Sequence, residues 1–246
     1  DARWTQNGVT VAGGRGHGNA TNQLVGPEGP FVHDDQTIII ADWGNRRVVR
    51  WSRRSGTTQG EIIIDNVDPY RLAMDDQRYL YISDYKKHEV RRYQIGHKNG
   101  AVVAGGNGQG AGLNQLRFPT YIFVDQQQTV YASDSLNNRV IKWNKGAKKG
   151  IVVAGGHGYG NALTQLYYPK GLFVDMLGTI YVADLVNHRV MRWHKGAKQG
   201  TVIMGGNGEG EEANQFKYPW DLSFCRQGSL YIVGQWNHGV QRFSIE

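Results

Sequence analysis

Apolar and polar positions follow a strand-like pattern throughout the chain. In one representative stretch, two short runs rich in Val, Ile, Phe and Tyr lie between Pro169 and Asp184, separated by turn-forming residues at 175–178. Residues 189–193 then alternate polar and apolar side chains, as a strand with one buried face requires, and residues 200–204 form a fourth apolar run. This stretch predicts four short antiparallel strands joined by turns.

The same four-strand pattern occurs five times. Its centres read IIIADWGNRRVVRW (38–51), LYISDYKKHEVRRY (80–93), VYASDSLNNRVIKW (130–143), IYVADLVNHRVMRW (180–193) and LYIVGQWNHGVQRF (230–243). We call the residues at the end of the second strand the anchors: Asp42, Asp84, Asp134, Asp184 and Gly234. The anchors are 42, 50, 50 and 50 residues apart, and a period of this length is typical of blades or solenoid turns.

The two ends of the chain complement each other. The fifth copy stops at Glu246 after its third strand, whereas residues 9–14 match the fourth strands at 102–106 and 152–156. Pairing residues 9–14 with the last copy would close a ring and cover both sheet edges. We therefore predict an all-β fold with a single domain over residues 1–246. It is a five-bladed β-propeller of four-stranded antiparallel blades, closed by pairing the N-terminal strand with the last blade.

The repeated units resemble NHL repeats. The elements that carry the resemblance are Pro169-Lys170-Gly171, Val174-Asp175, the Tyr-Val-Ala-Asp run at 181–184 and the Asn-His-Arg-Val run at 187–190. NHL propellers are often six-bladed, so the expectation of five blades rests on the count in this chain. The resemblance implies a platform for protein or RNA, while similar propellers also carry lyase and hydrolase sites, so the fold leaves the function open.

Most repeated positions have a structural interpretation. An Asp anchor and an Arg five residues later are expected to form charge-assisted pairs: Asp42 with Arg47, Asp134 with Arg139 and Asp184 with Arg189. The fifth copy replaces both members together, by Gly234 and Gly239, and the second copy has Glu89 in place of the Arg, where Lys87 is a candidate to compensate. The aromatic residue nine positions after each anchor is expected to pack between facing blades.

Glycines and histidines at repeated positions are also expected to serve the scaffold. Glycine-rich segments precede four of the copies and should supply the positive-φ turns of connectors, whereas the second copy lacks this segment and is shorter. His88, His188 and His238 share one repeat position, but neighbouring blades are about 10 Å apart, too far for one zinc ion. We therefore predict no metal site and no cofactor.

Composition narrows the possible partners without naming one. The formal charge of +7 and the pI of about 9.4 are compatible with RNA or another anionic polymer. No apolar run approaches the roughly 20 residues of a membrane span, so no membrane contact is expected. Cys225 is the single cysteine, which excludes an internal disulfide framework. A monomer is expected, and secreted and cytoplasmic locations both stay open.

Positions that differ between copies are the candidates for binding. These are the two residues after each inner-strand proline and the two after each anchor, which should emerge on one face of the propeller. Aromatic and charged residues at such positions are predicted to form an exposed ligand-binding rim. The candidate residues are Trp43, Tyr70, Arg71, Tyr85, Tyr121, Lys170, Trp220, Asp221 and Trp236.

Two main functions follow from these residues. We expect a non-enzymatic recognition scaffold that binds a protein or peptide on this top face, with RNA or a glycan as secondary ligands and with no catalytic residue. The alternative is a propeller lyase or calcium-dependent hydrolase with its site at the central axis. Glu28 and Asp221 are the carboxylates at candidate inner positions for such a site. A spacer module within a larger chain is a third possibility.

Overall fold

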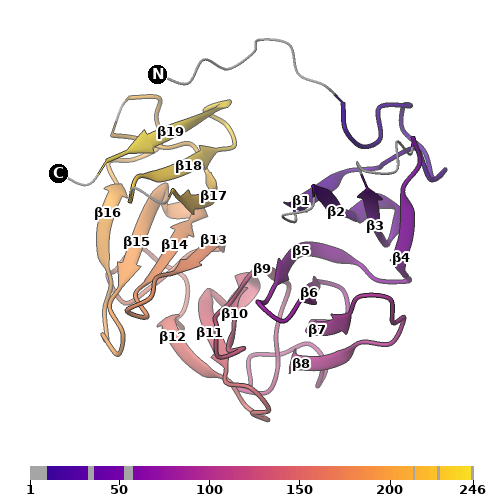
Figure 1. Cartoon of the computed structure of the whole chain (residues 1–246). Coiled ribbons are helices and arrows are strands. Elements are labelled where there is room, and N and C mark those ends of the chain that lie inside the picture. Colours follow the sequence, from indigo (N-terminus) through magenta and orange to yellow (C-terminus); the bar gives the residue numbers. More distant parts are fainter. Residues whose placement is uncertain (1–9, 33–35, 53–57, 213, 226–227, 245–246) are drawn as a thin grey trace.

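The computed structural model describes residues 10–32, 36–52, 58–212, 214–225 and 228–244. Figure 1 shows five small sheets arranged about a common axis, each with its first strand innermost. In each sheet the strands follow one another in chain order, and neighbouring strands pair antiparallel. The predicted five-bladed β-propeller of antiparallel blades is therefore confirmed.

The strands of each blade are as follows. Blade 1 contains β1 (Pro27–Val32), β2 (Thr37–Asp42), β3 (Arg47–Ser52) and β4 (Glu61–Asp65). Blade 2 contains β5 (Pro69–Met74), β6 (Tyr79–Asp84), β7 (Glu89–Gln94) and β8 (Ala101–Gly105). Blade 3 contains β9 (Pro119–Val124), β10 (Val130–Asp134), β11 (Arg139–Trp143) and β12 (Ile151–Gly155). Blade 4 contains β13 (Pro169–Val174), β14 (Ile180–Asp184), β15 (Arg189–Trp193) and β16 (Thr201–Gly205), and blade 5 contains β17 (Pro219–Phe224), β18 (Leu230–Gly234) and β19 (Gly239–Phe243).

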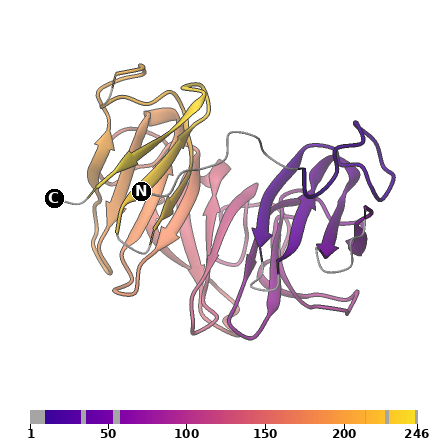
Figure 2. The same ribbon diagram turned by 45° about the horizontal axis from the view of Figure 1, so that its top comes forward.

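The inner strands pack against one another in chain order, β1 against β5, β5 against β9, β9 against β13 and β13 against β17. Figure 2 shows blades 1 and 2 on one side of the molecule and blades 4 and 5 on the other, with blade 3 between them. Short 3-10 turns follow three of the anchors, namely η1 (Trp43–Asn45), η3 (Ser135–Asn137) and η4 (Leu185–Asn187). Among the described residues, no helix has the length and apolar character needed to cross a bilayer.

The segment expected to close the ring is not paired in the described structure. Val9 lies outside the described residues, and residues 10–14 belong to no strand. The described strands of blade 5 accordingly form a three-stranded sheet, β17-β18-β19. Ala12 instead packs against Trp51 and its neighbours in blade 1. The described residues therefore show a contact of Ala12 with blade 1, and Val11 beside it is 52% exposed.

A backbone hydrogen bond that recurs in three blades also tests the predicted ring closure. In blades 2, 3 and 4 the glycine after the fourth strand donates its amide to a carbonyl in the turn between the second and third strands, as Gly156 does to Asn138 at 3.0 Å. The corresponding pair at closure would be Gly14 and His238, and the described structure contains no such bond. The pairing predicted for residues 10–14 is therefore absent at its expected register.

Aromatic side chains between blades make up much of the core, as predicted. Trp143 and Trp193 are almost fully buried at the ends of β11 and β15. A glycine at the start of the fourth strand leaves room for each ring, since a Cβ added at Gly200 would lie 2.8 Å from the Trp193 ring. Such spacing is closer than real side chains allow, so the repeated glycine and the repeated aromatic residue depend on each other.

The expected Asp–Arg pairs are present and buried. Arg189 Nε donates to Asp184 at 2.7 Å, and the guanidinium also donates to three carbonyls of the preceding glycine-rich connector. The same arrangement occurs for Asp42 with Arg47 and Asp134 with Arg139. In blade 2, Lys87 Nζ lies 3.5 Å from the Asp84 carboxylate and donates to a backbone carbonyl, so it compensates in part for the missing arginine.

In blade 5 the side-chain amide of Asn237 takes the place of the Asp–Arg pair. Asn237 Oδ1 accepts a hydrogen bond from the Lys217 amide at 2.7 Å, the role that Asp184 Oδ1 has for the Tyr167 amide in blade 4. A Cβ at Gly234 would collide with the Asn237 side chain. The joint loss of Asp and Arg in blade 5 therefore reflects a different, uncharged way of holding the same connector.

Candidate active site at the propeller axis

A β-bulge near the start of each inner strand positions the residues at the axis. The register of β13 against β14 shifts between Pro169 and Leu172, and β5 has the equivalent shift between Pro69 and Leu72. The inner strands β1, β9 and β17 have comparable irregularities near their first residues. Bulges turn side chains away from the strict alternation of a strand and are common beside functional sites. They allow residues directly after each proline to reach the axis.

Lys170 reaches from blade 4 to blade 2. Its Nζ donates a hydrogen bond to Tyr70 Oη at 2.6 Å. Its backbone carbonyl accepts a hydrogen bond from Ser133 Oγ of blade 3 at 2.7 Å. Only 2% of the Lys170 surface is exposed, although lysine is rarely buried unless it is paired. Tyr70 of blade 2 therefore fixes the end of the Lys170 side chain, and Ser133 of blade 3 fixes its backbone.

Aromatic rings surround the Lys170 ammonium. The Nζ atom lies 4.4 Å from the ring centroid of Tyr70 and 4.4 Å from that of Trp220. The rings of Tyr168 and Phe118 follow at 5.0 Å and 5.9 Å. A cation at such distances is attracted by the negative faces of the rings. This cage favours the charged form of the amine.

Burial disfavours the charged form of the Lys170 amine and has the largest effect on its pKa. It lowers the pKa of Lys170 to about 7, while the nearby carboxylate of Glu28 raises it. The pKa of Glu28 is itself raised, chiefly by burial, although Arg71 and Lys170 lower it. Enzymes lower the pKa of a catalytic lysine and raise that of a catalytic carboxyl group by burial in this way. The cluster therefore holds an amine with a pKa near neutrality close to a carboxyl group whose pKa is raised.

Arg71 and Asp221 form the more accessible side of the cluster. The Arg71 Nη2 atom lies 2.9 Å from Asp221 Oδ2, and 28% and 23% of the two side chains are exposed. Burial raises the pKa of Asp221, while the Arg71 guanidinium lowers it. Arg71 also lies over the Tyr121 ring, at 4.8 Å from its centroid. This guanidinium has the planar geometry that suits a substrate carboxylate.

The structure brings together most of the residues that the sequence singled out. The axial cluster contains six of the nine candidates, Tyr70, Arg71, Tyr121, Lys170, Trp220 and Asp221. Tyr85 packs beside Tyr70 at a centroid distance of 6.3 Å, and Trp43 stacks on Tyr85 at 6.3 Å. Trp236 contacts Tyr218 at 6.0 Å and is 59% exposed, so it lies at the periphery.

The candidate residues were expected to form an exposed rim, but those nearest the propeller axis are buried. Lys170, Tyr121 and Tyr70 are exposed by only 2%, 3% and 8%. The reason is that the inner strands converge, so side chains at equivalent positions of different blades cover one another. Trp43 and Trp236 come from turns after the anchors and stay exposed, at 43% and 59%.

Phe118 and Tyr168 belong to the cage but were not among the candidates. Each precedes an inner-strand proline and has a positive φ, 59° and 57°, which is uncommon for an aromatic residue. Their amides donate to side chains of the preceding blade, Phe118 to His88 Nδ1 at 3.2 Å and Tyr168 to Asn138 Oδ1 at 3.0 Å. The repeated aromatic-Pro pair in the sequence was the signal that could have found them. These contacts also give His88 a scaffold role.

The carboxylates at the axis do not form a metal-binding set. Glu28 and Asp221 are close enough for their charges to interact, as expected for the central-axis alternative. However, Asp221 is engaged by Arg71, and the Lys170 amine adds a further positive charge. Among the described residues, no group of three or more His, Cys, Asp or Glu side chains is placed to hold a metal ion. The Arg71 guanidinium and the Lys170 amine beside these carboxylates oppose the binding of a cation.

Comparison with solved structures identifies propellers of known activity. A gluconolactonase from Xanthomonas campestris matches with 16% identity and a TM-score of 0.65, over 90% of this chain and 73% of that one. A virginiamycin B lyase from Staphylococcus aureus, solved with quinupristin, matches with 10% identity and a TM-score of 0.59, over 89% and 66%. The nidogen–laminin complex matches with 17% identity and a TM-score of 0.67, over 88% and 74%.

The matched proteins are longer than this chain, which spans 58% of another neighbour, a Bacteroides thetaiotaomicron protein of unknown function. At these identities the likeness shows the propeller fold alone. No model of a known protein family matches the sequence, so membership of the NHL family is not confirmed. No curated protein matches either.

These findings correct the expected function. The prediction of a non-enzymatic recognition scaffold is wrong, because the gluconolactonase and lyase neighbours favour the enzymatic alternative. The nidogen–laminin structure shows a propeller of this shape in a protein complex. RNA binding and a monomeric state stay predictions.

Proposed function

We propose that this protein is an enzyme that performs a lyase-type, acid–base reaction at the propeller axis. The observation that carries the proposal is the buried Lys170 amine, hydrogen-bonded to Tyr70 at 2.6 Å and with its pKa lowered to about 7. A lysine used as a general base must be neutral near the working pH, and burial is the usual means of achieving this. The lyase neighbour supports the reaction class through its fold.

The proposed substrate is a carboxylate with a leaving group on the β-carbon. Arg71 would hold the substrate carboxylate, which would compete with Asp221 for the guanidinium. The neutral Lys170 amine would remove the proton from the α-carbon, and the electron pair of that bond would form a carbon–carbon double bond. The leaving atom would depart with its bonding electrons and take a proton from Glu28, whose raised pKa favours the acid form.

Tyr70 and the aromatic cage would position the base. Burial raises the pKa of Tyr70, so its hydroxyl stays protonated while its oxygen accepts the bond from Lys170. The rings of Trp220 and Tyr168 restrict the amine further and exclude water from it. A fixed base in a site with little water transfers protons more effectively than a solvated lysine.

The test is elimination from a panel of β-substituted carboxylates, such as malate and O-phosphoserine, followed through the ultraviolet absorbance or carbonyl content of the product. Lys170→Met and Glu28→Gln should each reduce kcat by roughly 100-fold or more, the usual contribution of a general acid or base. Lys145→Met removes an exposed lysine from the opposite face and should leave kcat unchanged. The proposal fails if the wild-type protein turns over no member of the panel, or if Lys170→Met retains full activity.

A further inference from the structure

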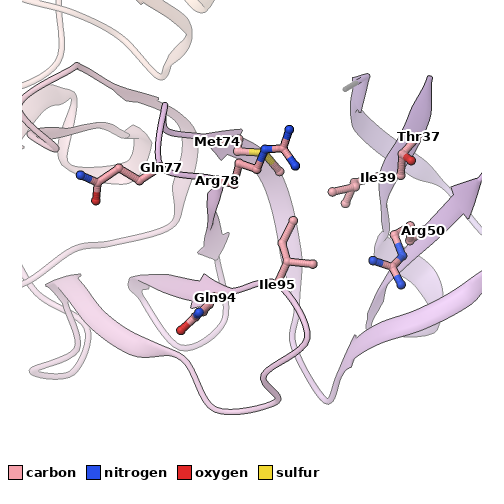
Figure 3. A pocket seen from close by; sticks show the side chains of 8 residues that line it. All are labelled: Thr37, Ile39, Arg50, Met74, Gln77, Arg78, Gln94 and Ile95. Atoms are coloured by element: carbon pink, nitrogen blue, oxygen red, sulfur yellow. The ribbon is translucent and has the colours of Figure 1, made fainter. Parts of the chain in front are cut away.

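A cavity of about 310 Å³ lies between blades 1 and 2. It is at the end of the blades opposite the inner-strand prolines and the anchors. In Figure 3, Ile39 and Arg50 of blade 1 face Met74, Arg78 and Ile95 of blade 2 across this space. The lining residues are Thr37, Ile39, Arg50, Met74, Gln77, Arg78, Gln94 and Ile95.

The cavity coincides with a departure from the repeat. Three residues before the anchor, blades 2 to 5 have a tyrosine: Tyr81, Tyr131, Tyr181 and Tyr231. Blade 1 has Ile39 at this position. In blades 2 to 4 the tyrosine ring packs in the core or against neighbouring rings, as Tyr181 does with Phe224 of the next blade at a centroid distance of 4.8 Å. Blade 1 therefore lacks an aromatic ring at a position where the other four blades have one.

The interface between blades 2 and 3 shows how this space is normally filled. Tyr81 Oη donates to Asp75 at 3.0 Å, and Gln128 from blade 3 donates to the same carboxylate oxygen at 2.7 Å. Gln128 also accepts a bond from Arg92 of blade 2, at 3.4 Å. A phenol ring, its hydroxyl and three polar side chains thus occupy the gap between these two blades.

Among the described residues around the cavity, positive charges exceed negative ones. By repeat position, Arg50 corresponds to Arg92, and Arg78 replaces the neutral Gln128. Arg50 is paired with Glu61 at 2.5 Å, whereas Arg78 forms no ion pair with another described residue. Among the described residues that line or pair at the cavity, two arginines therefore face one carboxylate. An anionic group would offset this imbalance.

We propose that the cavity binds a small aromatic anion, whose ring takes the place of the tyrosine that blade 1 lacks. Ile39, Met74 and Ile95 supply apolar contact for the ring, and Arg78 and Arg50 face its acidic group. Apolar cavities of about 150 Å³ accommodate benzene, so the space suffices for one ring with a carboxylate. This binding site is separate from the axial cluster and does not depend on the proposed reaction.

The test uses 4-hydroxybenzoate as the probe, because it combines a phenol ring with a carboxylate. Calorimetry or ligand-observed NMR should show saturable binding of one equivalent. The neutral amide, 4-hydroxybenzamide, and the cationic tyramine have the same ring and should bind at least tenfold more weakly. Equal binding of the three probes would overturn the proposed role of the arginines, and no saturable binding of 4-hydroxybenzoate would overturn the site.

Two variants taken from the protein's own repeats test the position. Ile39→Tyr restores the residue of blades 2 to 5, should fill the cavity, and should weaken 4-hydroxybenzoate binding at least tenfold without lowering the unfolding temperature. Arg78→Gln introduces the residue of blade 3, where Gln128 has nearly the same φ, 61° against 64°. It should weaken binding of the anion about tenfold and leave the amide unchanged, because a charge-assisted bond is lost. Unchanged binding in a folded Ile39→Tyr variant would place the ligand elsewhere and overturn the proposal.

Discussion

The charge of Lys170 results from competition between solvation and local contacts. Removal from water disfavours the ammonium, whereas the Tyr70 hydroxyl, the surrounding ring faces and Glu28 favour it. Because burial is the largest of these effects, the amine releases its proton near neutral pH. The residue therefore stores an unfavourable free energy in the folded state, which is the expected cost of burying an amine.

This cost should appear as a pH dependence of stability. The folded chain releases the Lys170 proton near pH 7, whereas an unfolded lysine keeps it up to its ordinary pKa of 10.5. Between these values the unfolded state binds more protons, so the free energy of unfolding should rise with pH, by up to about 1.4 kcal/mol per unit. Below about pH 7 both states are protonated and the full cost remains.

Lys170→Met isolates this contribution. Urea unfolding of the wild-type protein and the variant at about pH 7 and about pH 9 should show a rising stability for the wild type relative to the variant. Titrating groups that do not interact with Lys170 are common to both proteins and cancel in the difference, whereas the pKa of Glu28 changes with the loss of the amine. A pH-independent difference would mean that the aromatic cage keeps the ammonium charged, which would contradict the role of Lys170 as a base.

The buried Asp184–Arg189 pair allows a second test at single residues. Removing Asp184 alone leaves a buried guanidinium without its carboxylate, and we expect Asp184→Gly to cost about 3–5 kcal/mol. Arg189 also holds three connector carbonyls, so Arg189→Gly should cost a similar amount. The double variant resembles blade 5 and should cost less than the sum of the two, measured by urea unfolding. Additive losses would show that the two side chains act independently.

At the scale of elements, the β-bulges of the inner strands direct the residues after each proline toward the axial cluster. The strands and their order follow from the repeated apolar runs, and the variable positions after each proline mark most of the cluster. The repeat cannot show that Lys170 contacts Tyr70, because these residues are 100 positions apart and belong to blades that are not adjacent. Phe118 and Tyr168 were missed for a related reason, since their positive φ angles depend on partners in the preceding blade.

The close contact between β13 and β17 gives a prediction for these strands. A Cβ at Gly171 would lie 2.8 Å from the backbone Cα of Asp221, and a backbone atom cannot rotate away. Gly171→Ala should therefore destabilise the protein by roughly 1–3 kcal/mol, as overpacking does, and shift Lys170 relative to Trp220. Gly239→Ala is the matched control, since the nearest atom to its Cβ is 3.6 Å away. Equal unfolding midpoints for the two variants would contradict the close packing of these strands.

At the scale of the whole molecule, the five blades are not held equally. Blades 1, 3 and 4 have a buried Asp–Arg pair and four described strands, whereas blade 5 has neither. The side chains of β19 are largely exposed, including Val240 at 63%. Repeat proteins derive their stability from each repeat and from its contacts with the next one. We therefore expect blade 5 to be the least stable unit of the described structure.

Native-state hydrogen exchange should reveal this order directly. Amides of β18 in blade 5 should exchange through a subglobal opening of lower free energy than those of β10 in blade 3, which lies between two other blades. The Arg71–Asp221 pair joins blade 2 to blade 5 across the axis, so Arg71→Gln should lower the protection of β18 further. The effect on β10 should be smaller, because Arg71 reaches blade 3 only through its contact with the Tyr121 ring. This result would mean that the residues proposed to bind substrate also hold blade 5 in place. Uniform protection of β10 and β18 would instead require an additional contact that secures blade 5, such as pairing of residues 9–14 with β19.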